Sequence, residues 1–580
     1  MSFLRTTFMT AYRSRIYPNY WDVLALLIVL AVIFLFAWNA KQMATPYEVG
    51  QTLTISLAPS HLFFYAGRTV VRMLIALCCS LLFTFIFATW AAKSPRAGRI
   101  IIPIIDILQS VPILGFLSVT ITGFIALFPN SLLGPECAAI FVIFTSQAWN
   151  MALGFYQTVR SVPGEINEAA RMFHLSSWQR FWRIDVPFSM PGLLWNAMVS
   201  MSAGWFFVVA SEAITVSNQQ ILLPGIGSYI AVAIQAADIH AIIYAVIAMF
   251  IVILLYDQLL FRPLVAWAEK FKSEQLTSDK IAESWVIDLF RRTRMMRNIG
   301  GQLTILFDRF VNIRFFRTQF GIPVKLILPT KENRVVSMLL TAVFFVAVIA
   351  ALVFLSDYII KNFSLSATLY VFYLGLITAF RVFIMIVLCS LVWVPIGVWI
   401  GLRPRAAQLA QPIAQFLAAF PANLLYPFFV MTIVYYHLNP NIWLTPLMIL
   451  GAQWYILFNV IAAASNIPKD LLQAADNFGV TGWLRWSRLL LPGIFPYYVT
   501  GAITAAGGAW NASIVAEVAS WGDQKLVATG LGAYISEYTT AGNFPQIALG
   551  IGMMCLLVLV FNRLVWRPLY VYAESRFLVE

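Results

Sequence analysis

The sequence predicts an all-α, polytopic membrane protein with about 12 transmembrane helices, arranged as two parallel six-helix repeats. Three observations predict this fold class: apolar stretches close to bilayer length, an internal repeat, and basic clusters that fall on one side of the spans. Of 580 residues, 61% are hydrophobic and 11% are charged, and mean hydropathy is +0.81, which excludes a soluble globular enzyme. The runs Val23–Phe36, Leu339–Leu355 and Ile547–Phe561 lack the polar alternation of an outer-membrane barrel.

An internal repeat divides the chain into two halves. Equivalent residues lie 309 positions apart early in each half, as for Arg72 and Arg381, and 305 positions apart from Pro163 and Pro468 onward. Because each half repeats one fold, we expect three parts: a first transmembrane half, a basic cytoplasmic linker and a second transmembrane half. These parts span 1–270, 271–334 and 335–580. Further pairs are Trp178 and Trp483, Arg183 and Arg488, Trp205 and Trp510, and Gly227 and Gly532.

Six apolar spans are predicted in each half. Arginines precede the first span and no small-residue cleavage pattern follows it, so we expect a retained anchor rather than a signal peptide. If the N-terminus is cytoplasmic, the basic clusters at 93–99, 160–183 and 262–334 all lie inside, and so does the C-terminus. The predicted spans are 22–39, 69–92, 100–128, 137–157, 193–216, 240–261, 336–355, 370–400, 412–436, 442–464, 497–517 and 544–565.

The formal charge of +13 sits in these membrane-flanking clusters, so it indicates topology in a lipid bilayer and no nucleic-acid partner. The basic, aromatic linker is either an interfacial helix on the cytoplasmic leaflet or a plain connector. The five cysteines lack metal-ligand spacing. No Gly-Lys dipeptide occurs, so the Walker loop that binds nucleotide phosphates is absent. We therefore expect no enzyme activity, no catalytic residue and no metal on this chain.

The most informative stretch is a polar cytoplasmic loop that follows Pro163 and recurs after Pro468. A polar loop of this length between two spans is expected to form a short helix and to dock a cytoplasmic partner. The first copy carries Glu168, Ala169, Ala170 and His174, and the second carries Gln473, Ala474, Ala475 and Gly479.

This loop resembles the EAA loop of ATP-binding cassette (ABC) importer permeases, in which Glu-Ala-Ala is followed by a glycine. The resemblance implies the ABC type I importer permease fold. It also implies that each loop helix docks on one of two separate ABC ATPase subunits, which bind ATP and Mg, while this chain binds no cofactor. His174 replaces the glycine of the first copy and Gln473 replaces the glutamate of the second. These departures imply that the two couplings are not equivalent.

The fifth span of each half adds a second resemblance. Each contains a tryptophan, ends in Glu212 or Glu517, and is followed by Gly-Ile-Gly or Gly-Leu-Gly. This pattern resembles the nitrate, taurine, alkanesulfonate and bicarbonate branch of ABC permeases, over essentially the whole chain. It implies import of a small anion, delivered by an extracytoplasmic substrate-binding protein, across the bacterial inner (plasma) membrane.

Polar and aromatic side chains within the spans are candidates for the pathway or its gate. Because an unpaired carboxylate in hydrocarbon is costly, Glu212 and Glu517 are expected to face the boundary between the halves or to bond to nearby loop backbone. Arg72 and Arg381 either help to attract anions or snorkel to lipid headgroups, and snorkelling is the preferred interpretation. The other candidates, whose amide, hydroxyl and indole groups can donate to an anion, are Gln109, Ser110, Gln147, Asn150, Trp205, Gln415, Asn423, Gln453, Trp510 and Asn511.

Two other functions fit part of this pattern. A fused ferric-ion or thiamine importer permease shares tandem EAA loops, although the Trp and Glu pattern of the fifth spans favours the anion branch. An ion-coupled secondary transporter also has two parallel six-helix halves. It needs coupling carboxylates in mid-membrane, and the spans offer few beyond Asp106, which lies near an inside end.

Overall fold

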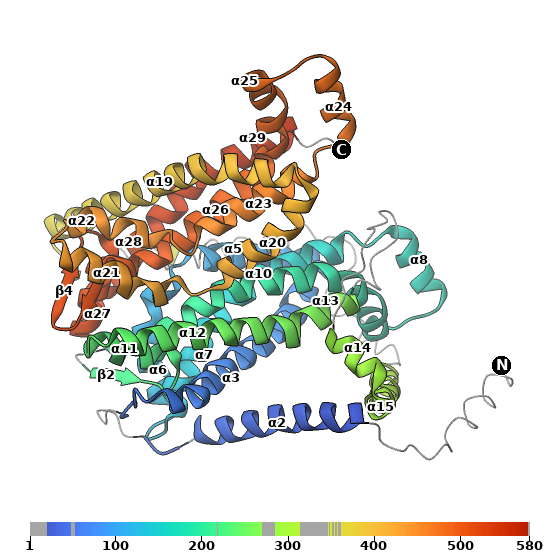
Figure 1. Cartoon of the computed structure of the whole chain (residues 1–580), viewed down its shortest axis with the longest axis horizontal. Helices are drawn as coiled ribbons and strands as arrows, with labels where there is room; N and C mark the ends of the chain where they lie inside the picture. Colours follow the sequence, from blue (N-terminus) through green and yellow to red (C-terminus); the bar gives the residue numbers. More distant parts are fainter. Residues whose placement is uncertain are drawn as a thin grey trace. The chain divides into compact units, whose positions relative to one another are not determined.

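The computed structural model describes residues 20–43, 45–47, 53–216, 219–268, 285–313 and 361–577, with isolated positions between 346 and 357. Within these residues the regular structure is helical apart from two short β-hairpins (Figure 1). Seven described helices are long and apolar enough to cross a membrane, or nine when each of two bent pairs counts as one span. The predicted polytopic, all-α class is confirmed. The predicted span at 336–355 lies outside the described residues except for isolated positions.

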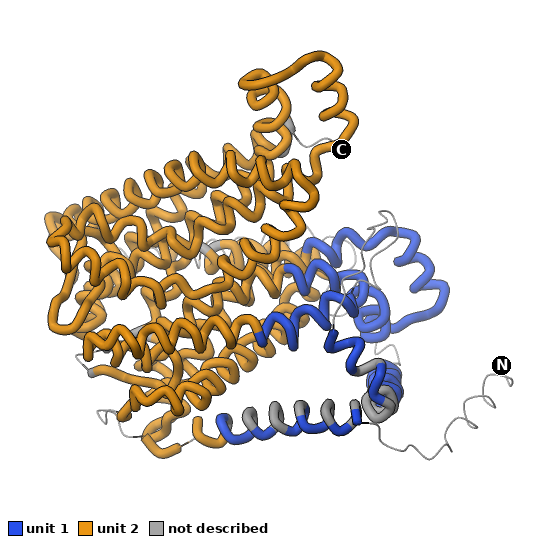
Figure 2. Tube along the Cα trace, viewed as in Figure 1, with its two compact units in different colours: residues 1–39, 157–195, 255–333 blue, residues 40–156, 196–254, 334–580 orange. Residues whose placement is uncertain are grey.

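The chain divides into two compact units, which are described separately (Figure 2). Unit 1 comprises Met1–Asn39, Gln157–Trp195 and Leu255–Asn333, and unit 2 comprises Ala40–Tyr156, Asn196–Leu254 and Arg334–Glu580. Within unit 1 lie α8 (Gly164–Met172), α9 (Ser177–Arg180), α13 (Arg262–Ala268), α14 (Trp285–Arg292) and α15 (Arg294–Val311). The division passes through α2 (Tyr20–Met43), α7 (Leu133–Arg160), α10 (Val186–Glu212) and α12 (Ile239–Tyr256).

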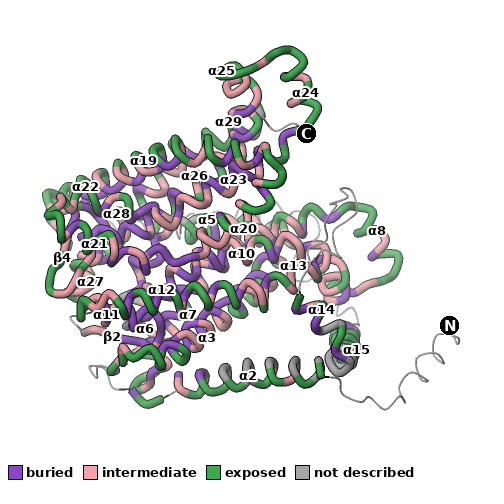
Figure 3. Tube along the Cα trace, viewed as in Figure 1, coloured by how far each residue is buried: buried purple, intermediate pink, exposed green. Residues whose placement is uncertain are grey.

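Unit 2 contains the main hydrophobic core, in which α26 (Leu491–Ala516) packs against α23 (Gln453–Ser465) and α19 (Leu365–Gly401) (Figure 3). Its first-half helices are α3 (Leu62–Phe83), α4 (Thr89–Lys93), α5 (Pro95–Ser110), α6 (Leu117–Leu127) and α11 (Ile226–Gln235). Its second-half helices are α19 (Leu365–Gly401), α20 (Pro404–Ala419), α21 (Tyr426–Tyr435), α22 (Pro440–Trp443), α23 (Gln453–Ser465), α24 (Lys469–Asn477), α25 (Gly482–Arg485), α26 (Leu491–Ala516), α27 (Leu531–Ala541), α28 (Phe544–Phe561) and α29 (Arg567–Phe577).

Prolines determine where the spans bend. Pro112 and Pro421 follow α5 and α20, and the break after α20 bends the chain by 80° before α21. A proline disfavours helical geometry in the residue before it, so each helix ends there. Helix α7 runs unbroken for 28 residues. Its counterpart in the second half is bent by 43° at the break between Met448 and Gln453, shortly after Pro446, which stands at the position equivalent to Phe141.

A β-hairpin follows the fifth span of each half. Strands β1 (Ala213–Val216) and β2 (Gln219–Leu222) pair antiparallel, as do β3 (Val518–Trp521) and β4 (Gln524–Val527). The prediction that the fifth span extends to residue 216 was wrong, because α10 ends at Glu212 and β1 begins at Ala213. The hairpin leads the chain from the end of α10 into α11, and the equivalent hairpin leads α26 into α27.

Candidate functional site

The two EAA-like loops form equivalent short helices. Helix α8 in unit 1 and helix α24 in unit 2 are nine residues each and occupy equivalent positions of the repeat. Ala170 and Ala475 are buried, whereas Phe173 and Phe478, just after the helices, are 78% and 85% exposed. Each helix therefore turns an alanine inward and ends in an exposed aromatic ring. Of the other predicted coupling residues, Glu168, Gln473, His174 and Gly479 are exposed and Ala169 and Ala474 are half-buried.

Both helices end in the same left-handed turn. The backbone N–H that follows the turn donates to the carbonyl of Ala170 (3.1 Å) in one loop and of Ala475 (2.8 Å) in the other, as in a Schellman motif. The residue within the turn has a positive φ, +49° for His174 and +64° for Gly479. Glycine adopts this conformation freely, whereas a residue with a side chain is strained in it. The turn therefore explains why glycine suits this loop position.

His174→Gly is expected to stabilise the α8 loop by about 1 kcal/mol, because it relieves the left-handed strain. The measurement is hydrogen–deuterium exchange of the peptide 164–175 in the purified full chain, which should slow about fivefold. The matched control is Gly479→His, which should speed exchange of 469–480 by a similar factor. Unchanged exchange in both variants would show that the turn carries no strain.

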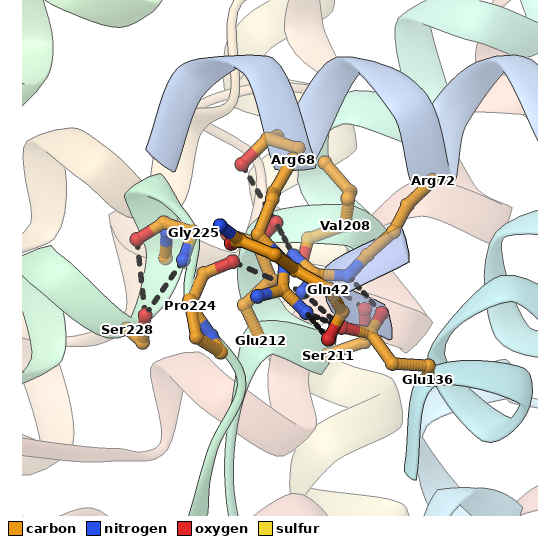
Figure 4. A network of polar contacts seen from close by, with 12 residues as sticks. Gln42, Arg68, Arg72, Glu136, Val208, Ser211, Glu212, Pro224, Gly225 and Ser228 are labelled. Atoms are coloured by element: carbon orange, nitrogen blue, oxygen red, sulfur yellow. Dashed lines mark hydrogen bonds and ion pairs between the residues drawn. The ribbon is translucent and has the colours of Figure 1, made fainter. Parts of the chain in front are cut away.

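A buried ionic network joins three helices of the first half within unit 2, α3, α7 and α10 (Figure 4). Arg72 on α3 is fully buried and makes a bidentate pair with Glu136 on α7, at 2.5 and 2.8 Å. Its third nitrogen donates to Glu212 at the end of α10 (2.6 Å). Arg68 adds a bond to Glu136 (2.8 Å). Two arginines balance two glutamates, so the buried charges are mutually compensated.

Glu212 also binds the backbone at the start of α11 and holds the preceding loop in place. Its Oε2 accepts from the N–H of Gly227 (2.6 Å), and its Oε1 accepts from the hydroxyl of Thr69 (2.7 Å). The glycines here are needed for space: a Cβ on Gly225 would lie 2.2 Å from the Glu212 carboxyl carbon, and one on Gly227 would lie 2.2 Å from a backbone oxygen. The Gly-Ile-Gly sequence therefore lets the backbone close over a buried carboxylate.

The second half repeats this arrangement with fewer charges. Glu517 accepts from Thr378 (2.8 Å), from Arg381 (3.3 Å) and from the N–H of Ala533 (2.9 Å). Arg381 also donates to Asn441 (3.1 Å), which occupies the position of Glu136 in the repeat. Ile377 stands where the first half has Arg68. The second half thus lacks one acid and one base together, and its charges still balance.

The snorkelling prediction for the two arginines was wrong. Arg72 is 0% exposed and Arg381 11% at the side chain, and both donate to buried carboxylates. Sequence reasoning considered each arginine alone and so favoured lipid headgroups over a partner on another helix. The signal available in the sequence was a second acid, Glu136, at the start of its span. The alternative that Glu212 and Glu517 bond to neighbouring loop backbone is confirmed.

A cavity of about 380 Å³ lies within unit 2, between helices of the two halves. Residues at equivalent positions of the two halves line this cavity. The pseudo-twofold axis that relates the halves therefore passes through it. The equivalent pairs are Gln109 and Ala418, Ile113 and Ala422, Ser146 and Gly451, Asn150 and Tyr455, Val199 and Thr504, Ser202 and Gly507, Ala203 and Gly508, Phe206 and Asn511, and Phe207 and Ala512.

The cavity brings together some of the predicted pathway residues and leaves others elsewhere. Gln109, Asn150, Trp510 and Asn511 line it, as does Asp106. Asn511 accepts from the backbone N–H of Ile113 (2.7 Å), which ties the second half to the break after α5. The other described candidates, which do not line this cavity, are Gln147, Trp205, Glu212, Gln415, Asn423, Gln453 and Glu517. The side chain of Ser110 lies outside the described part of the chain.

Comparison with known proteins gives one match in each half. Residues 80–261 and 393–566 match the family described as binding-protein-dependent transport system inner membrane component. Nitrate import permease protein NrtB of Leptolyngbya laminosa is 28% identical over 157 residues, 27% of this chain and 51% of the relative.

Two further relatives are similar over comparable lengths. Bicarbonate transport system permease protein CmpB of Synechococcus elongatus is 30% identical over 134 residues, 23% of this chain and 45% of the relative. Glycine betaine/proline betaine transport system permease protein ProW of Escherichia coli is 25% identical over 201 residues, 34% of this chain and 54% of the relative. The chain spans about half the length of the curated relatives that it matches.

Proposed function

Because the chain belongs to the family of binding-protein-dependent transport system inner membrane components, we propose that it forms the translocation pathway of an ABC importer for a small anion. The family matches once in each half, so both halves of the pathway come from one polypeptide. The chain is an inner membrane component, and we place both of its termini in the cytoplasm. In this role it is a permease subunit and not an enzyme.

The cavity of unit 2 is the observation that carries this proposal. A pathway shared by two parallel repeats has to run along the axis that relates them. Nine pairs of equivalent residues line the cavity, one member from each half, which is the arrangement such a pathway requires. A volume of about 380 Å³ accommodates a small ion with part of its hydration shell.

The substrate class rests on the relatives and on the fifth-span pattern. Two of the relatives are named for nitrate and bicarbonate, both small monovalent anions, and one is named for betaines. The anion is imported after delivery by an extracytoplasmic substrate-binding protein. A permease for ferric ion or thiamine, the other ABC alternative, has no counterpart among these three relatives.

The two loop helices support coupling to separate ATPase subunits. Each of α8 and α24 presents an exposed phenylalanine, Phe173 or Phe478, next to a buried alanine. Exposed aromatic rings on short rigid helices suit insertion into a cleft of a partner. Two ATPase subunits, each receiving one helix, bind ATP and Mg and rock the membrane halves between inward and outward states.

The test is to crosslink the tagged full chain in its native membrane, purify it and identify co-purifying chains by mass spectrometry. Recovery of a Walker-containing ATPase and a secreted binding protein is the expected result. The assembled complex in proteoliposomes should then take up nitrate, bicarbonate or a sulfonate when ATP is supplied. Repeated recovery of the chain alone, with uptake driven by an ion gradient, would overturn the proposal in favour of a secondary transporter.

Asp106→Asn distinguishes the same two mechanisms. Asp106 lines the cavity, and an ion-coupled transporter would use such a carboxylate to carry its coupling ion. In an ATP-driven permease the carboxylate is not needed for coupling, so the variant should retain ATP-dependent uptake at a near wild-type rate. Loss of uptake with ATP hydrolysis unchanged would contradict the ATP-driven mechanism.

A further inference from the structure

Helix α15 (Arg294–Val311), in the linker, is amphipathic. Its apolar residues recur at the spacing of helical turns, and its charged residues fall between them. The apolar face carries Met296, Ile299, Leu303, Leu306, Phe307 and Phe310. The opposite face carries Arg294, Arg297, Asp308 and Arg309. A helix with this pattern normally buries its apolar face against another apolar surface.

The apolar face of α15 is exposed in the part of the helix whose side chains the structure describes. Leu303 and Leu306 are 59% and 56% exposed, and Phe307 and Phe310 are 44% and 40% exposed. A contiguous exposed apolar face of this kind marks an interaction surface. The described part of the chain therefore does not bury the face that the sequence of α15 provides.

Helix α15 is held at the start of the fifth span of the first half, within unit 1. The Phe310 ring lies against Trp178 and Trp182, with ring centroids 5.1 and 5.6 Å apart. The Trp178 indole N–H donates to the Phe310 carbonyl (3.3 Å), and the Gln179 amide donates to Asn312 Oδ1 (3.0 Å). Both tryptophans lie in the first two turns of the helix that forms this span. Tryptophans at the end of a span sit at the level of the lipid headgroups, so α15 lies at that level.

The orientation of α15 suits the plane of a membrane surface. Figure 1 draws α15 nearly end-on, whereas the part of α10 in unit 1 (Val186–Trp195) runs across the picture. Helix α14 is attached near the end of the sixth span, because the Trp285 indole N–H donates to Gln258 (3.3 Å) in the π-helical turn Asp257–Phe261. A helix that crosses a span at its end, with one charged and one apolar face, has the geometry of an interfacial helix.

The second half shows the same segment without such a helix. Trp483 and Leu484 occupy the positions of Trp178 and Gln179 in the repeat. They are 77% and 53% exposed, whereas Trp178 is half-buried and Gln179 is 8% exposed. Helix α15 therefore covers the segment that follows the first loop helix, and no described residue covers the equivalent segment of the second half to this extent.

We propose that α15 is a membrane-surface helix, which inserts its apolar face between the lipids of the cytoplasmic leaflet and binds the phosphates of anionic lipids through its arginines. Charge favours this partner: residues Trp285–Val311 contain five arginines and two aspartates, and the cytoplasmic leaflet is negatively charged. Through Phe310 and Asn312, α15 then holds the segment after α8 at the bilayer. The importance of this hold for coupling rests on the proposed function, in which α8 docks on an ATPase subunit.

The test maps lipid contacts directly. The full chain is reconstituted in nanodiscs of phosphatidylcholine and phosphatidylglycerol, with a photoactivatable diazirine near the start of one acyl chain of the phosphatidylglycerol. After illumination, crosslinked peptides are identified by mass spectrometry. Crosslinks within the peptide 300–311, at Leu303 or Leu306, are the expected result. Crosslinks to the spans without any in this peptide would overturn the proposal.

Leu303→Glu and Ile305→Glu form a matched pair of variants. The two side chains are similarly exposed, at 59% and 56%, but Ile305 lies on the charged face. Leu303→Glu places a carboxylate at the acyl boundary, so the crosslink yield of the peptide should fall about tenfold, whereas Ile305→Glu should change it by less than about twofold. An equal loss in both variants would show that this face does not insert.

Hydrogen–deuterium exchange tests the effect on the loop. Replacing the phosphatidylglycerol with phosphatidylcholine should speed exchange of the peptides 300–311 and 177–185 by at least about threefold. The equivalent peptide of the second half, 482–490, is the internal control and should not change. Equal changes in 177–185 and 482–490, or no change in 177–185, would overturn the hold on the first loop.

Uptake by the assembled complex separates this proposal from the proposed function. If the complex imports an anion with ATP but α15 does not crosslink to lipid, the function stands and the lipid-binding helix is wrong. If α15 crosslinks as expected but the complex imports no anion, the lipid-binding helix stands and the proposed function is wrong.

Discussion

Arg72→Met is expected to destabilise the folded protein strongly. Arg72 is 0% exposed and bridges Glu136 and Glu212, so its loss leaves two buried carboxylates without their principal cation. Removing one partner of a buried ion pair costs about 3–5 kcal/mol, against a total stability of about 5–15 kcal/mol for a typical domain. The measurement is the fraction of detergent-solubilised protein that elutes as a single species, with its thermal midpoint.

The second half of the chain supplies the control for this network. Its residues Ile377 and Asn441 occupy the positions of Arg68 and Glu136. Glu136→Asn alone leaves excess positive charge buried and should lower the thermal midpoint strongly. Arg68→Ile combined with Glu136→Asn restores neutrality and should recover most of the loss. A double variant as unstable as the sum of the two single variants would show that the four residues do not act as one charge-balanced unit.

Ala170→Phe together with Ala475→Phe is expected to uncouple ATP hydrolysis from uptake. Both alanines lie in the last turn of their loop helix and are buried, with 4% and 9% of their surface exposed. Overpacking such a site costs about 1–3 kcal/mol and displaces the helix, so uptake should fall about tenfold or more while the spans remain inserted. The measurements are uptake and ATP hydrolysis by the assembled complex in proteoliposomes.

Ala170→Ser with Ala475→Ser is the matched control, because serine needs little additional space and should preserve coupling. Full uptake in the double phenylalanine variant would refute the assignment of these helices as the coupling elements. The two single phenylalanine variants should differ from each other, since the loops differ at His174 and Gly479.

The architecture was predictable because its determinants are local or periodic. Apolar runs predicted most of the spans, and the recurrence at 305 and 309 positions predicted that α8 and α24 would be equivalent helices. Prolines at equivalent positions, such as Pro112 and Pro421, mark the same breaks in both halves. The β-hairpins were not predicted. Their first strands are four residues long and directly follow a long apolar helix, so no change in hydropathy marks where the helix ends and the strand begins.

The candidate site was predictable only in part, because side-chain partners depend on tertiary packing. Asn511 and Trp510 line the cavity as expected, whereas Trp205 is buried outside it. Trp566 was missed, since in the sequence it is one of 19 tryptophans and its position suits an interfacial anchor. Its place at the cavity depends on the π-helical turn Asn562–Trp566, which it ends and which hydropathy does not reveal.

Asn511 and Phe206 occupy equivalent places in the repeat but carry different chemistry. In a pathway assembled from two identical gene products, every mutation changes both walls at once. Joining two copies in one reading frame removes that restriction, so selection can alter one wall while the other keeps the fit between helices. A new substrate preference can then arise from a single codon change, without a matching change on the opposite wall.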